Sequence, residues 1–278
     1  MKRFLAVLLA ALLAVTMLAA CGDNANDDPQ NGGNGNEVVG NGDETPDNGE
    51  ADGEDDVQGD EDVVVMSYAE YAAAELETQV VVETYVQAKQ SWWENSATLY
   101  TQDQDGAYFI YNVACSEEDY AKLTEGTKIR VTGYKAEWAG EVEIIDGTFE
   151  IIEGDTFVAE PKDVTSLLGT DELIDSQNQL VSFKGMTVEP STDADGNEVA
   201  YLYSWDGSGT EGDDLYFNVS VNGNTYSFVV ESDLCDSTTE VYSAVKNLQV
   251  GDKIDMEGFL YWYEGVNPHI ISVTPAAE

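Results

Sequence analysis

One motif that occurs twice, at a constant spacing of 125 residues, constrains the fold of this chain more than any other feature. Leu123–Tyr134 follows the pattern Leu-x-x-Gly-x-Lys-Ile-x-Val-x-Gly-aromatic, and Leu248–Phe259 follows it with Met in place of Val. The same spacing aligns Trp138 with Tyr263. Self-similarity of this kind is the signature of a repeated structural unit. The sequence therefore predicts two copies of one fold.

The motif itself predicts a β-strand that bends. In each copy a turn glycine, Gly126 or Gly251, precedes apolar residues at alternate positions, which is the pattern of a half-buried strand. Gly133 and Gly258 stand inside that strand, where glycine often marks a bulge or a sharp bend. A further strand follows after a tight connection in both copies. Each motif thus predicts the last two strands of its unit.

Upstream of the first motif, the sequence predicts three more strands and a short helix. Alternating apolar residues begin at Val80, and Ala97–Tyr100 and Ala107–Val113 flank an Asp-Gly turn as a hairpin. Ser116–Leu123 is expected to form a short acidic helix. The second copy matches the first strand at Val181 and carries an insertion of about 24 residues.

Five strands with a helix between the third and the fourth is the order of the OB-fold. The predicted fold class is therefore mainly β: two OB-fold-like five-stranded barrels with short helices. We place the first OB-like domain at residues 63–160 and the second, with its insertion, at residues 161–278. A capping-box pattern, Ser67 followed three residues later by Glu70, predicts a short helix at the start of the first domain.

These residues resemble a family. The repeated motif, with Tyr100–Tyr108 before its first copy, is similar to bacterial extracytoplasmic lipoproteins that carry tandem OB-fold domains of a nucleic-acid-binding-like type, as in clostridia-like bacteria. The resemblance covers about residues 66–275. It implies the fold and no catalytic motif. Because OB barrels bind oligonucleotides, oligosaccharides and proteins, it leaves the ligand to be argued from the site.

The N-terminal residues predict export and lipidation. Lys2 and Arg3 precede an apolar run that ends in small residues, which is typical of a signal peptide at residues 1–20. Leu18–Cys21 resembles the bacterial lipobox, so Cys21 is the expected lipidation site. A transmembrane anchor is the alternative, but the run is short for a bilayer core and Thr16 interrupts it. We expect an extracytoplasmic protein that is lipid-anchored to the cell membrane.

Residues 21–62 are expected to form a disordered acidic linker. They contain no aromatic residue and no Lys or Arg, and they consist mainly of Asn, Gly, Asp and Glu. So little apolar surface cannot offset the backbone entropy that folding would remove.

The charge of the chain is strongly negative, at −44 overall. Residues 63–278 hold forty Asp and Glu against nine Lys and Arg, a net charge near −31. Such a field repels phosphate backbones, so we expect nucleic acid to be a poor partner. A soluble, non-adhesive surface is the plain explanation of the acidity, and binding of cations or of a basic partner is the alternative.

Nothing in the sequence indicates an enzyme. The chain has a single histidine, His269, and no Gly-x-Ser-x-Gly motif, so a catalytic triad has no visible base. Cys115 and Cys235 share no metal-ligand spacing with it, and we expect two separate thiols rather than a disulfide. Asp193–Glu198 imitates the start of a calcium loop but reads more simply as a turn. No cofactor and no metal site are expected.

Aromatic residues give the clearest functional indication. OB barrels commonly meet ligands near the loops that join strands 1 to 2 and 4 to 5. Flat side chains at these loops suit sugar rings or a protein surface. The expected ligand-binding residues are Trp92, Trp93, Trp138, Tyr261, Trp262 and Tyr263. They could instead fill the barrel ends or the contact between the domains.

Together these features predict a membrane-anchored, extracytoplasmic, non-enzymatic binding or adaptor module. Its ligand would be a glycan or a protein, and its membrane contact would be the lipid anchor. Two alternatives remain open: a passive structural lipoprotein of an envelope complex, and a single-stranded nucleic-acid-binding protein.

Overall fold

The computed structural model describes residues 64–277, all of which belong to one compact unit, Gln58–Glu278. The predicted signal peptide, Cys21 and the acidic linker lie outside the described residues. Within residues 64–277, no helix has the length and apolar character needed to cross a bilayer.

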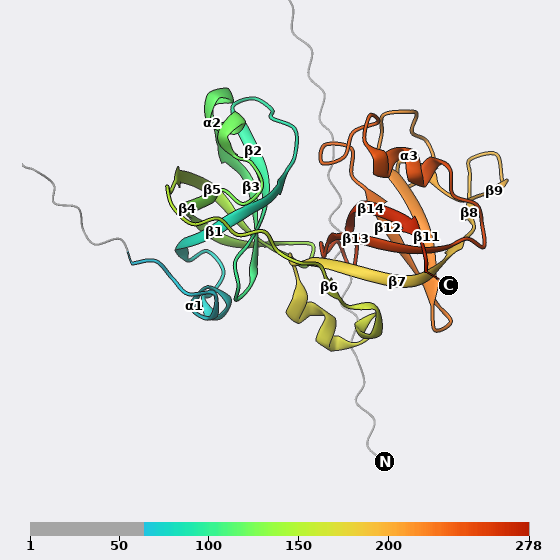
Figure 1. The fold of residues 1–278 in the computed structure, drawn as a ribbon, viewed down its shortest axis with the longest axis horizontal. Helices are drawn as coiled ribbons and strands as arrows, with labels where there is room; N and C mark the ends of the chain where they lie inside the picture. Colours follow the sequence, from blue (N-terminus) through green and yellow to red (C-terminus); the bar gives the residue numbers. More distant parts are fainter. Residues whose placement is uncertain (1–63, 278) are drawn as a thin grey trace, which may run out of the picture. The chain divides into compact units, whose positions relative to one another are not determined.

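Five strands close into a first barrel, in the order β1-β2-β3-β5-β4 (Figure 1). All neighbours are antiparallel except β3 and β5, which are parallel. The strands are β1 (Gln79–Lys89), β2 (Ser96–Gln102), β3 (Ala107–Ala114), β4 (Lys128–Trp138) and β5 (Glu141–Ile151).

Two short helices accompany the first barrel, and both begin at the serine that the sequence indicates. Helix α1 (Tyr68–Ala73) has the predicted capping box, in which Ser67 and Glu70 satisfy each other's backbone N–H groups. Helix α2 (Glu117–Lys122) lies between β3 and β4, and the Ser116 side chain accepts the backbone N–H of Asp119.

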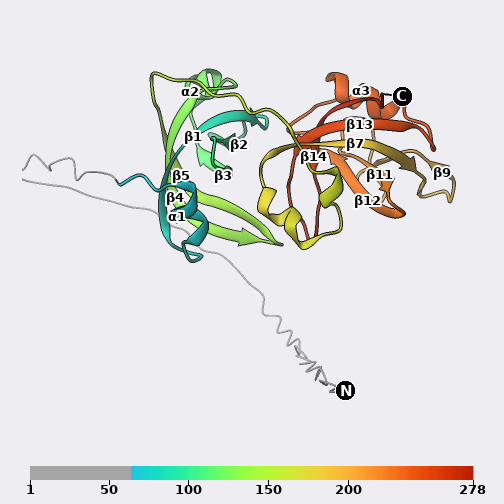
Figure 2. The same ribbon diagram turned by 60° about the horizontal axis from the view of Figure 1, so that its bottom comes forward.

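The second barrel repeats this topology in the order β7-β11-β12-β14-β13, and β7 pairs with both β11 and β13 to close it. Helix α3 lies between β12 and β13 and packs against β14 and β11 (Figure 2). These elements are β7 (Leu180–Glu189), β11 (Leu215–Val221), β12 (Asn224–Val230), α3 (Glu240–Lys246), β13 (Lys253–Phe259) and β14 (His269–Pro275).

Short elements precede and interrupt the second barrel. The insertion predicted after its first strand holds the β8–β9 hairpin and β10, and two 3-10 turns stand where the first copy has helix α1. They are β6 (Lys162–Asp163), η1 (Thr165–Leu167), η2 (Asp171–Ser176), β8 (Ser191–Thr192), β9 (Glu198–Val199) and β10 (Leu202–Tyr203).

The structure confirms the predicted fold class of two OB-like barrels, and the repeated glycines occupy equivalent places. Val80 pairs with Gly133 in the first barrel, as Val181 pairs with Gly258 in the second. Both glycines stand at β-bulges. A Cβ on Gly133 would lie 2.6 Å from the Ile144 side chain, and one on Gly258 would lie 2.3 Å from a backbone oxygen, so neither site has room for a side chain.

Each barrel encloses its own apolar core, with residues such as Leu99 and Ile110 fully buried in the first and Phe183 and Phe217 in the second. A third cluster joins the barrels: Tyr100 and Phe109 of the first pack with Phe259 and Tyr261 of the second. This third cluster positions the candidate site.

Candidate ligand site between the barrels

The two barrels meet through stacked rings. Tyr100 on β2 stacks on Phe259 of β13 with ring centroids 4.5 Å apart, and Phe109 on β3 meets Tyr261 edge-on at 5.2 Å. Aromatic pairs in these geometries stabilise a contact beyond the area that they bury. We call these four residues the aromatic seam.

His269 completes the seam as a neutral group. Its Nδ1 lies 2.5 Å from the Tyr100 hydroxyl, and its ring stacks on Tyr261 with centroids 4.2 Å apart. Burial lowers the pKa of His269 to about 3, because a charged imidazolium would lose its hydration there. The lone histidine therefore serves packing between the barrels.

Glu141, fully buried at the start of β5, binds the second barrel. One of its carboxyl oxygens accepts the Trp262 backbone N–H at 2.8 Å and a side-chain N–H of Gln177 at 3.2 Å. The other oxygen has no partner among the described residues. Burial raises the pKa of Glu141 to about 8, so the protonated acid predominates at neutral pH.

Further hydrogen bonds fix the barrels against each other on both sides of the seam. The Gln177 and Asn178 side chains donate to the backbone oxygens of Gly140 and Val142 at 2.8 and 2.9 Å. On the other side, the Ser91 N–H donates to the Asp233 backbone oxygen at 2.7 Å. Each barrel therefore provides hydrogen-bond partners for polar groups of the other, and the contact between the barrels consists of hydrogen bonds as well as aromatic packing.

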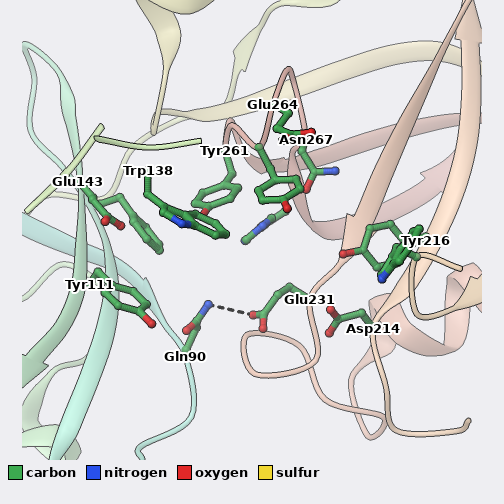
Figure 3. Close-up of a pocket in the computed structure, with 14 residues that line it drawn as sticks. Gln90, Tyr111, Trp138, Glu143, Asp214, Tyr216, Glu231, Tyr261, Glu264 and Asn267 are labelled. Carbon is green, nitrogen blue, oxygen red and sulfur yellow. Dashed lines mark hydrogen bonds between the residues drawn. The ribbon is translucent and has the colours of Figure 1, made fainter. Parts of the chain in front are cut away.

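Beside the seam lies a cleft with a volume of about 810 Å³, which Figure 3 shows with its lining side chains. This volume is within the range of small-ligand sites, about 300 to 1,000 Å³. Aromatic side chains from both barrels form most of its walls. They are Phe109, Tyr111 and Trp138 from the first barrel, and Trp205, Tyr216, Tyr261 and Tyr263 from the second.

Rings at equivalent positions of the two repeats meet at this cleft. Trp138 and Tyr263, which the 125-residue spacing aligns, have ring centroids 5.1 Å apart. Gly140 adopts φ +94°, and a Cβ there would lie 2.9 Å from the Trp262 ring. The lack of a side chain at Gly140 therefore allows the Trp262 ring of the second barrel to pack closely against the first barrel.

The charged residues that line the cleft are all acidic: Glu143, Asp214, Glu231 and Glu264. Burial, helped by Asp214 and Asp233, raises the pKa of Glu231 to about 7. Its carboxylate accepts the Gln90 side chain at 3.1 Å across the cleft, as the dashed line in Figure 3 marks. Burial also raises the pKa of Glu143.

The structure brings together three of the six aromatic residues that the sequence singles out. Trp138, Tyr261 and Tyr263 line the cleft, and Tyr261 also belongs to the seam. Trp262 packs against the core of the second barrel. Trp92 and Trp93 are absent from the lining.

Trp92 and Trp93 sit at the end of the first barrel. The Trp92 indole N–H donates to the Cys115 backbone oxygen at 2.9 Å. Trp93 is 71% exposed and lies at a tight turn in which Glu94 and Asn95 have positive φ. Their role in ligand binding stays a prediction.

The remaining lining residues were not predicted from the sequence. Tyr111 and Phe109 stand on the predicted hairpin strand, and Trp205 lies in the insertion between β7 and β11, where a lone tryptophan was the available signal. Glu143 carries no signal, because it is one of forty acidic residues in the two domains.

The two thiols and the calcium-like loop lie away from the cleft lining. Cys115 and Cys235 are free and buried, and burial raises the pKa of Cys235 to about 12. Asp193–Glu198 is a hairpin turn in which the Asp193 carboxylate accepts the N–H groups of Asp195 and Asn197. Among the residues that the structure describes, no group of three His, Cys, Asp or Glu side chains is placed to hold a metal.

No family model and no curated protein matches the chain. Among solved structures it is similar to a murine DNA-binding protein bound with dsDNA, at 12% identity and a TM-score of 0.35, over 71% of this chain and 97% of the other. It is similar to the Ifi202 HINa domain with 20-base-pair dsDNA, at 13% identity and a TM-score of 0.32, over 73% and 98%. It is also similar to the p204 HINb domain, at 8% identity and a TM-score of 0.33, over 70% of this chain and 94% of the other.

These comparisons give no support to the lipoprotein and clostridia-like parts of the resemblance. At these identities and TM-scores, they carry no argument about the ligand of this chain.

One expectation is corrected. The net charge of the chain led to the expectation that nucleic acid is an unlikely partner, yet two of the matching structures are described as complexes with dsDNA. Net charge is not sufficient to exclude nucleic acid, because it sums the whole surface whereas nucleic acid meets one local face. Nucleic acid is therefore kept as a candidate below.

Proposed function

We propose that this protein is a non-enzymatic binding module that takes a glycan in the cleft between its two barrels. The observation that carries the proposal is the cleft itself, where seven aromatic residues and a few polar groups surround about 810 Å³. Aromatic walls with a small number of oriented polar groups are the usual composition of a ligand site. Flat rings pack against the apolar faces of sugars, and carboxylates accept their hydroxyl groups.

A glycan suits this cleft better than a folded protein surface does. Protein partners generally bury about 800 Å² on each side over a broad patch, whereas a cleft of this volume surrounds a compact ligand. A passive structural role predicts that the cleft binds no ligand. A titration of the protein with oligosaccharides therefore separates the structural role from the proposed binding function.

The test is a matched pair of tryptophan substitutions in the full-length protein. Trp138→Ala removes a ring from the cleft, and Trp93→Ala removes an exposed ring outside it. Titration with chitin- and cellulose-type oligosaccharides, followed by calorimetry, should show binding that Trp138→Ala weakens about tenfold or more and Trp93→Ala leaves unchanged. Equal losses in both variants, or no binding at all, would refute the proposal.

We further propose that the module is held outside the cytoplasm by a lipid on Cys21. The support is the sequence pattern around Leu18–Cys21, which lies outside the described residues. Acyl chains contribute about 0.8 kcal/mol per buried CH₂, so their loss should release the protein. Cys21→Ala should move the protein to the medium or leave it unprocessed, whereas a membrane-bound protein of mature size would contradict lipidation.

Nucleic-acid binding is the second candidate. The observation in its favour is the pair of OB-like barrels with exposed rings at their junction, since rings stack on unpaired bases. Fluorescence anisotropy with labelled single-stranded and double-stranded DNA at low salt tests it. Saturable binding that Trp138→Ala weakens would favour DNA as the ligand of the cleft.

A further inference from the structure

The side chain of Glu143 is largely buried, and its carboxylate reaches the cleft without a partner from the described part of the protein. The residue stands on β5 opposite Phe109 and is 7% exposed. No hydrogen bond or ion pair reaches its side chain from any described residue. Figure 3 shows this carboxylate on the same wall of the cleft as Tyr111 and Trp138, directed at the open volume.

A buried carboxylate without a partner costs free energy, because protein groups do not replace the water it has lost. Proteins normally pair such groups with a cation or with hydrogen-bond donors. The raised pKa of Glu143 reflects this burial. None of the residues that line the cleft is a Lys or Arg, so a cationic partner for this carboxylate would have to come from a ligand.

The rest of the cleft favours a positive group as well. Glu231 on the facing wall has only the neutral Gln90 side chain and local backbone N–H groups as partners. Asp214 and Glu264 add negative charge at the cleft. The rings of Trp138 and Tyr263 present electron-rich faces, which attract ammonium groups through cation–π interactions.

We propose that the glycan bound in the cleft is an amino sugar with a free, protonated amine, which Glu143 receives. This inference rests on the proposed function and names the class of its ligand. The ammonium group takes the position opposite the Glu143 carboxylate, and the sugar rings lie along Trp138 and Tyr263. An N-acetylated sugar has no positive charge to offer the Glu143 carboxylate.

The probes are a β-1,4-linked glucosamine tetrasaccharide and its N-acetylated counterpart, titrated calorimetrically into the full-length protein near neutral pH and about 0.15 M salt. The wild-type protein should bind the amine form about tenfold or more tightly than the acetylated form. Glu143→Gln should remove most of this preference.

The matched control is Glu125→Gln, which removes one exposed acidic charge from the same barrel without touching the cleft. It should keep the preference, because attraction by net charge alone would respond to both substitutions equally. Equal losses in the two variants would overturn the inference. Spermidine is a second control, since an amine without sugar rings should bind more weakly than the glucosamine tetrasaccharide.

The outcomes separate the inference from the function on which it rests. If both tetrasaccharides bind with equal affinity and Trp138→Ala weakens both, the glycan proposal stands and the amine preference is wrong. If neither binds, both fail. If spermidine binds as tightly as the glucosamine tetrasaccharide, the sugar rings contribute nothing and the inference is overturned.

Discussion

The two barrels share a topology but contribute different faces to their contact. The first barrel offers its β2–β3 face through Tyr100 and Phe109, whereas the second offers β13 and the adjoining loop through Phe259 and Tyr261. If the two barrels contacted each other through equivalent faces, the same residues would be buried in both copies. Unequal use leaves a cleft beside the contact between the aligned residues Trp138 and Tyr263. The two repeats thus form the two walls of the cleft, and the cleft stays open because the barrels contact each other through different faces.

The largest effect should follow from cutting the seam at Phe259. Truncation of a buried Phe to Ala generally costs about 3 to 5 kcal/mol. Phe259→Ala should lower the melting temperature and separate the unfolding of the two barrels into two calorimetric transitions. Phe228→Ala, in the core of the second barrel, is the control and should destabilise that barrel without loosening the seam. A single sharp transition in Phe259→Ala would show that the seam does not couple the barrels.

The repeated glycines test whether the two copies are physically equivalent. Gly258→Ala places a methyl group against backbone atoms, while Gly133→Ala first meets the movable Ile144 side chain. Overpacking of this kind costs about 1 to 3 kcal/mol, and we expect Gly258→Ala to be the more damaging of the two. Gly147→Ala, whose nearest neighbour is 3.4 Å away, is the control for chemical denaturation. The reverse order would mean that the second barrel relaxes more easily than the first.

Glu141 should give the contact between the barrels a pH dependence. Its pKa rises from the ordinary 4.5 to about 8 in the folded protein, so the stability it contributes is fully present below pH 4.5. That contribution is lost as the pH rises from 4.5 to about 8, because the carboxyl group of the unfolded chain ionises in this range while the buried one keeps its proton. Glu141→Gln stays neutral throughout.

The melting temperature of Glu141→Gln relative to wild type should therefore increase between pH 4.5 and 8 and then level off. At about 1.36 kcal/mol per pKa unit and about 2 to 4 °C per kcal/mol for a domain of this size, the expected shift is on the order of 10 °C. Glu125→Gln should show no such trend. A difference that does not change with pH would mean that Glu141 is ionised in the folded protein.

The sequence predicts the barrels well and the cleft only in part. The 125-residue spacing and the bulge glycines predict strand geometry, which depends on residues close in the sequence. The structure shows the repeated strands and the bulges at both glycines. Trp138 and Tyr263 were found because they follow the repeated motif directly. Which faces of the barrels meet depends on contacts between distant residues, such as Glu141 with Trp262, and no local pattern encodes those.

The same reason explains why the position of Trp92 and Trp93 outside the cleft could not be predicted. Trp92 and Trp93 follow the first strand, a usual place for ligand contacts, but the second barrel covers the neighbouring β2–β3 face instead. Glu143 becomes distinctive only through its burial without a partner. The corrected expectation about nucleic acid has a similar origin, since a total charge says little about one face.

Hydrogen–deuterium exchange with the glucosamine tetrasaccharide tests the central claim most directly. If the cleft between the barrels is the site, protection should appear on both barrels at once, around Trp138–Glu143 and Tyr261–Asn267, with Trp92–Asn95 unchanged. Protection confined to Trp92–Asn95, or to one barrel alone, would contradict a ligand site built by the pair.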